Sequence, residues 1–99
     1  MKHVYGYVAK DGKIKSGSEN FSVVRSSKGE YTVAFEPGTF TKMPAVSVAQ
    51  IYYGKFSYEK GAGGNAVTRV INQDKVELVT MYDEILLDRD FSFIAVSDC

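Results

Sequence analysis

The chain has 99 residues, of which 44% are apolar and 24% charged, as is typical of one soluble globular domain. Its twelve basic and twelve acidic residues cancel, which argues against nucleic acid or an anionic membrane as the main partner. Cys99 is the one cysteine, so no intrachain disulfide forms, and no apolar run approaches the ~20 residues needed to cross a bilayer.

Short runs of strand-favouring residues follow one another along the chain. Tyr31, Val33 and Phe35 alternate with smaller or more polar residues, which is the pattern of a half-buried strand. Turn signals such as Asp11-Gly12 and Pro37-Gly38 separate the runs. We expect strands, in chain order, at residues 3–9, 14–15, 21–25, 30–35, 45–53, 66–72, 75–82 and 91–97.

Two stretches differ from this pattern. Residues 54–64 are too glycine-rich for a regular element and predict a loop. Residues 83–89 contain the one plausible helical turn, built around Leu86 and Leu87. Together these features predict an all-β fold, an antiparallel β-sandwich of six to eight short strands in a single domain over residues 1–99, with a small barrel as the alternative.

Two of the expected strands, 75–82 and 91–97, carry apolar residues on both faces. One face of an antiparallel sheet normally meets solvent and is polar, so a covered second face is expected. A partner subunit is the natural cover in so short a chain, and we expect a homo-oligomer; ordinary surface hydrophobic residues are the alternative. The apolar residues are Val76, Leu78, Val79 and Met81 in the first strand and Phe91, Phe93, Ile94 and Val96 in the second.

Catalytic constellations are missing from the sequence. His3 is the one histidine and lies near the terminus, so Ser–His or Cys–His machinery would need both chain ends. Zinc sites draw on several Cys or His ligands, and the glycines of residues 61–64 do not match a phosphate-binding motif. We therefore expect no enzyme activity, no cofactor and no metal.

One acidic cluster, formed by Asp83, Glu84, Asp88 and Asp90, has Arg89 within it. Carboxylates this close together suit calcium, but the spacing of a regular calcium loop is missing. A solvated connection in which Arg89 compensates its neighbours is the favoured interpretation. A hydrolase that uses these carboxylates ranks behind the binding functions, because glycosidase chemistry needs two carboxyl groups across a groove.

Aromatic residues gather where the expected strand 45–53 meets the glycine-rich loop. Tyr52, Tyr53, Phe56 and Tyr58 offer flat apolar rings, and the tyrosines add a hydroxyl that suits sugars and protein partners. Core packing or subunit contact is the alternative role for these rings.

The neighbouring strand adds polar groups to these rings. Arg69 and Asn72 lie on it, although Arg69 is also placed to pair with Glu77 across the hairpin. The ligand-binding candidates are therefore Tyr53, Tyr58, Arg69 and Asn72.

The pattern also resembles a known family. Residues 31–35, Phe40 and residues 44–48 look like the middle of H-type lectin domains and related phage tail-fibre domains, and residues 91–96 resemble their final strand. The resemblance implies an antiparallel β-sandwich that assembles as trimers or dimers of trimers and binds carbohydrate at exposed loops or subunit edges. No ligand-binding residue is carried over from it; the four candidates rest on their position and chemistry.

The leading hypothesis is a non-catalytic binding or structural module that forms a homo-oligomer, with a trimer favoured and glycans as candidate ligands. The alternative is a protein-interaction domain that binds a protein partner through the surface of residues 52–58. Because the first residues lack the long apolar core of a signal peptide, we expect cytoplasmic synthesis, with a virion-associated location left open.

Overall fold

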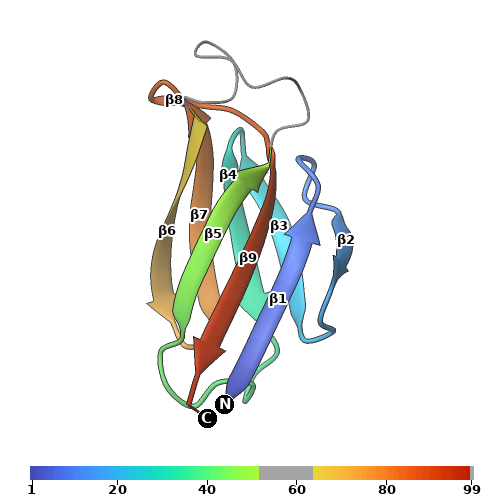
Figure 1. Ribbon diagram of the computed structural model, residues 1–99, viewed down its shortest axis with the longest axis vertical. Coiled ribbons are helices and arrows are strands. Elements are labelled where there is room, and N and C mark those ends of the chain that lie inside the picture. The colour runs from blue at the N-terminus through green and yellow to red at the C-terminus, as the bar shows by residue number, and fades with distance from the viewer. Residues whose placement is uncertain (52–63, 99) are drawn as a thin grey trace.

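The computed structural model describes residues 1–51 and 64–98, and this part of the chain contains strands and no helix (Figure 1). All strand pairs are antiparallel, which confirms the all-β sandwich that the alternating patterns predict. The strands are β1 (Lys2–Val8), β2 (Ile14–Gly17), β3 (Phe21–Ser27), β4 (Glu30–Phe35), β5 (Ala45–Ile51), β6 (Gly64–Asn72), β7 (Lys75–Tyr82), β8 (Ile85–Leu86) and β9 (Asp90–Ser97).

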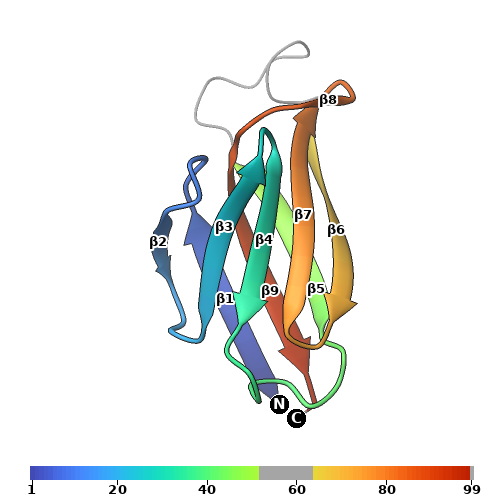
Figure 2. The same ribbon diagram turned by 180° about the vertical axis from the view of Figure 1, so that it is seen from behind.

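The strands form two sheets that lie face to face. Sheet A has the order β2-β1-β9-β5 and lies in front in Figure 1; sheet B has the order β3-β4-β7-β6 and lies in front in Figure 2, with β8 paired to the end of β7. The two ends of the described chain lie side by side at one end of the sandwich (Figure 1), because β1 and β9 pair along almost their whole length.

The core lies between the sheets and is built from every second residue of the inner strands, as the pleat of a β-strand requires, together with Phe40 from the connection between β4 and β5. Aromatic rings pack there edge to face, with 5.0 Å between the ring centres of Phe21 and Phe93 and 5.1 Å between those of Phe35 and Phe40. The buried hydrophobic residues are Val4, Val8, Tyr31, Val33, Phe35, Phe40, Val76, Leu78, Phe91, Phe93 and Ala95.

The expected helical turn within residues 83–89 is wrong. Asp83 and Glu84 have φ angles of 51° and 67°, so they form a tight two-residue turn of the kind that joins hairpin strands with the natural twist. Leu86 then pairs with Met81 in β8, instead of continuing a helix. The strand expected at 45–53 has its described part in β5, and residues 52 and 53 lie outside the described residues.

Candidate functional site

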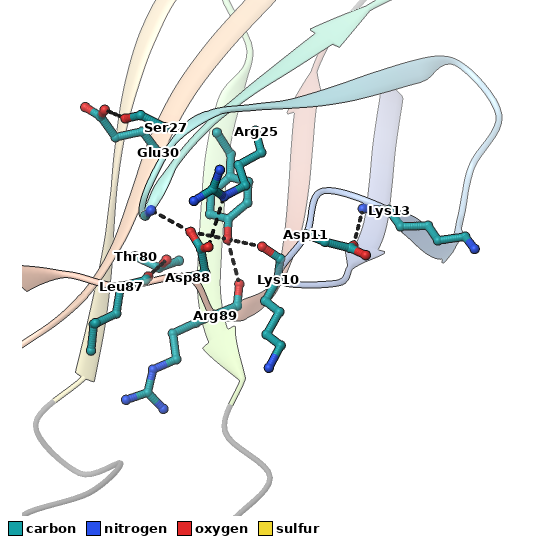
Figure 3. Close-up of polar contacts among 12 residues, drawn as sticks. Lys10, Asp11, Lys13, Arg25, Ser27, Glu30, Thr80, Leu87, Asp88 and Arg89 are labelled. Carbon is teal, nitrogen blue, oxygen red and sulfur yellow. Dashed lines mark hydrogen bonds and ion pairs between the residues drawn. The ribbon is translucent and has the colours of Figure 1, made fainter.

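A charged cluster holds together the turns at the end of the sandwich opposite the termini (Figure 3). The Asp88 carboxylate accepts hydrogen bonds from the Gly29 backbone N–H at 2.7 Å and from the Arg25 Nε–H at 2.9 Å. The buried Tyr31 ring reaches the same place, and its hydroxyl donates to the Lys10 carbonyl oxygen at 2.6 Å. The connection that leads into β9 is thereby tied to the β3–β4 turn and to the turn after β1.

Asp90 forms a second anchor two residues later. Its carboxylate accepts hydrogen bonds from the Lys10 backbone N–H at 2.8 Å and from the Tyr7 hydroxyl at 3.3 Å, and the residue is only 8% exposed. The sequence hypothesis of a solvated acidic connection is therefore wrong for Asp90. Among the residues that the structure describes, no group of three or more His, Cys, Asp or Glu side chains is arranged to hold a metal ion.

Electrostatics fix the protonation states of this cluster. The hydrogen bond from Arg25 lowers the pKa of the Asp88 carboxyl below its ordinary value, and the same bond raises the pKa of the Arg25 guanidinium. Burial, followed by the charge of Asp88, raises the pKa of the Tyr31 hydroxyl to about 12. At neutral pH the carboxylate is an anion and the phenol a neutral donor, which suits an anchor better than a proton-transfer group.

An open hollow of about 560 Å³ lies beside the cluster and is lined by Lys10, Asp11, Arg25 and Asp88. The two cations are matched by two anions. Asp88 is bonded to Arg25, and the Asp11 carboxylate accepts a hydrogen bond from the Lys13 N–H at 2.9 Å. A hollow with balanced and largely engaged charges favours neither an anionic nor a cationic ligand.

The outer face of sheet A has a different character. In the middle of this face Tyr5 lies opposite Ile94, and Ile94 lies opposite Ser47, so the three side chains form one row across β1, β9 and β5. Every second residue of these strands points outward in the same way. From β1, β9 and β5 the outward residues are His3, Tyr5, Tyr7, Asp90, Ser92, Ile94, Val96, Ala45, Ser47, Ala49 and Ile51.

Only one of these outward residues is an acid and none is a lysine or arginine. The acid is Asp90, which lies at one margin and is covered by its bonds to Lys10 and Tyr7. We call this surface the uncharged face. Both Tyr5 and Ile94 at its centre are exposed.

The outer face of sheet B carries charges instead. Its central row runs from Arg69 through Glu77 and Thr32 to Val24, and Lys75 and Glu30 lie in the neighbouring rows. Arg69 and Glu77 form an ion pair across the β6–β7 ladder. The outer face of sheet B therefore carries charges that the uncharged face of β1, β9 and β5 lacks.

Two of the four predicted ligand-binding residues, Tyr53 and Tyr58, lie outside the described residues. The side chains of the other two have partners within the chain. Arg69 donates from Nε to the Glu77 carboxylate at 3.1 Å, as the alternative interpretation of the sequence predicts. Asn72 accepts a hydrogen bond from the Asp74 N–H at 2.7 Å, which closes the β6–β7 turn.

Sequence reasoning did not predict the anchoring roles of Asp88 and Asp90. Arg25 is 63 residues from Asp88, and Lys10 is 80 residues from Asp90, so no local pattern connects them. The uncharged face did leave a signal, since Ile94 and Val96 are the outward residues of the strand predicted to be apolar on both faces.

No helix in the described part of the chain is long and apolar enough to cross a membrane. In comparisons with known proteins, no family model, no curated protein and no solved structure matched the chain. The resemblance to H-type lectin and phage tail-fibre domains therefore rests on the residues quoted for it above.

Proposed function

We propose that this domain is a non-catalytic binding or structural module that assembles with copies of itself through the uncharged face. The single observation that carries the proposal is the contrast between the uncharged face of β1, β9 and β5 and the outer face of sheet B. Outward side chains on β1, β9 and β5 expose apolar and neutral groups, whereas those of sheet B include lysine, arginine and glutamate.

A second copy of the chain is the occupant that fits this face best. Two uncharged faces meet without stripping water from a charge, and removing that water costs several kcal/mol per buried ion. Exposed aliphatic and tyrosine side chains supply apolar area, and tyrosine is enriched in protein interfaces. Face-to-face contact also gives the outward residues of β9 the cover that their apolar character predicts.

The uncharged face is smaller than one side of a standard protein–protein interface, so the proposed contact reaches beyond its three strands. Strand rise and spacing give β1, β9 and β5 together an area of about 350 Å² in plan, against about 800 Å² per partner in a standard interface. Further apolar surface adjoins it, because Met1 and Met43 line a hollow of about 300 Å³ together with Ala45 and Val96. Lys42 at this hollow supplies part of a polar rim.

The carbohydrate ligand and the trimer are part of the proposal only because the sequence resembles H-type lectin and phage tail-fibre domains. A glycan array probed with the assembled protein tests the ligand, with binding to at least one glycan class expected. Absence of binding to every glycan on the array would remove the lectin part of the proposal and leave the assembly intact.

The assembly is tested by light scattering coupled to size exclusion. Ile94→Lys places an ammonium group at the centre of the uncharged face, where Ile94 is 45% exposed, and we expect a lower assembled mass than that of the wild type. Val24→Lys is the matched control, because Val24 is 62% exposed on the outer face of sheet B, and its mass is expected to be unchanged. A wild-type chain that runs as a monomer at all concentrations contradicts the proposal.

A further inference from the structure

Strand β6 forms one outer margin of the sandwich in both views (Figures 1 and 2). It pairs with β7 on one side, and no described strand pairs with its other edge. With nine residues it is the longest strand in the described part of the chain. No described strand therefore bonds the backbone groups along this edge, which extends over a considerable length.

The ladder shows which backbone groups face outward. Thr80 of β7 donates its N–H to Gly29 and accepts from Leu87, so its backbone groups point away from β6. Because backbone direction alternates along a strand, Val79 and Glu77 of β7 point toward β6 and bond their partners there.

The β6 partners of those two residues are Val67 and Arg69. The N–H and C=O groups of Ala66, Thr68 and Val70 between and beside them consequently point to the free edge.

From Gly64 to Val70 the β6 ladder is regular, with its register shift only after Val70, and this regular part is longer than the ladders at the opposite side of the sandwich. There β2 has four residues and a register shift in its ladder, and the ladder of β3 has a shift between Arg25 and Ser27. Short strands and bulges of this kind prevent edge pairing. β6 contains no proline or lysine, and the charge of its Arg69 is paired with Glu77.

We propose that β6 pairs antiparallel with β6 of a second copy, about a two-fold axis at Val67, so that sheet B continues across two molecules. In this register Ala66 bonds with Thr68 of the second copy, which joins backbone groups that already point outward. Val67, 51% exposed, meets Val67 of the second copy, and Arg69 lies opposite the neutral Asn65 of the second copy. A register shifted to place Arg69 opposite itself is disfavoured by like-charge repulsion.

The β6 contact adds a second self-association contact to the proposed assembly through the uncharged face. It rests on the proposed function only in that both require a second copy of the chain. It uses the edge of sheet B, whereas the proposed function uses the outer face of sheet A. Ile94→Lys removes the uncharged-face contact and leaves β6 intact. The two contacts can therefore fail separately, and the edge contact is best measured in the Ile94→Lys chain.

Residue-resolved amide hydrogen exchange tests the edge contact. In the Ile94→Lys chain we expect the amides of Ala66, Thr68 and Val70 to slow by about tenfold or more as concentration rises through dimer formation. The amides of Val67 and Arg69, which donate to β7, serve as internal controls and keep their rates. Exchange of the first three amides that stays fast and independent of concentration overturns the proposal.

A substitution that places a charge on the proposed two-fold axis at Val67 provides the second test. Val67→Lys, added to Ile94→Lys, places two ammonium groups opposite each other in the pair, so the dimer and the protection of Thr68 are expected to be lost. Val24→Lys in the same background is the matched control and is expected to keep both. Dimers that survive Val67→Lys with Thr68 still protected overturn this register, and circular dichroism confirms that each variant is folded.

Discussion

Gly29 lies at the tightest backbone contact among the turns at the charged end of the sandwich. Its φ angle is +73°, and a Cβ placed there would lie 2.8 Å from the Leu87 nitrogen and 2.9 Å from the Thr80 carbonyl oxygen. Gly38 has a similar φ angle of +87°, but a Cβ there meets nothing within 4 Å. The two glycines therefore share the backbone requirement and differ in the space around them.

Alanine substitutions at these two glycines separate the two effects. Gly38→Ala is expected to cost about 1 kcal/mol through backbone strain alone. Gly29→Ala is expected to cost about 1–3 kcal/mol more, because the β3–β4 turn must move off the chain before β9. Urea unfolding of both variants measures the difference, and equal losses would show that the turn is loosely packed.

The pH dependence of stability belongs to Asp88. Because its folded pKa is lowered, Asp88 contributes stability that is present above its unfolded pKa of about 4 and is lost as pH falls through the folded pKa. Asp88→Asn is expected to destabilise the domain at pH 7 by about 1 kcal/mol, since the carboxylate is partly exposed. The gap between wild type and variant should be constant from pH 5 to 8 and shrink below about pH 4.

Unfolding in urea across that pH range measures the gap. A difference that persists unchanged into strong acid would assign the loss to packing around the side chain instead of its charge. The Tyr31 hydroxyl, whose pKa is raised to about 12 mainly by burial, stays protonated throughout the range and does not contribute.

At the scale of elements, local pattern was sufficient wherever a strand alternates between turn signals. β4 and β7 begin and end at the residues predicted for them, because Gly29, Pro37 and the 72–74 turn mark their ends. Of the two, only β4 alternates with a clean period of two. The sequence did not predict β8, because the adjacent apolar residues Leu86 and Leu87 suggested a helical turn. The positive φ angles of Asp83 and Glu84 instead turn the chain back so that the next residues pair with β7.

The candidate surfaces were less predictable than the strands. Apolar outward residues of β9 marked the uncharged face, but the sequence could not show that β1 and β5 flank β9 and add further neutral rows. The free edge of β6 likewise follows from sheet order, which long-range pairing decides. Arg69 and Asn72 were predicted to bind a ligand because their side chains are polar. In the structure these side chains form hydrogen bonds with Glu77 and Asp74 of the same chain.

For the whole molecule, the central pair of sheet A joins the two ends of the described chain. β1 and β9 lie between β2 and β5, and Lys2 is opposite Ser97. Sheet A therefore forms only when the first and last strands meet. All-β domains dominated by such distant pairings fold in milliseconds to seconds, because loop closure precedes the contacts that stabilise it.

A circular permutant isolates the entropic cost of bringing the first and last strands together. Joining Asp98 to Met1 through a short Gly-Ser linker and opening the chain between Pro37 and Gly38 makes β9 and β1 a local hairpin. The opened connection joins β4 to β5, which share no ladder, so no paired strands are separated by the cut. Shortening the closed loop by about four doublings saves about 2 kcal/mol of closure entropy, at about 0.6 kcal/mol each.

If β1–β9 pairing is formed in the transition state, the permutant refolds about thirtyfold faster than the original chain and has the same circular dichroism spectrum. Stopped-flow refolding in the Ile94→Lys background measures the rate with the uncharged-face contact removed, and the lowest workable concentration limits pairing through β6. An unchanged rate would place the rate-limiting step in sheet B, where short turns join β3 to β4 and β6 to β7. Sheet A would then be completed after the barrier, and its uncharged face would become available for assembly only as the last step of folding.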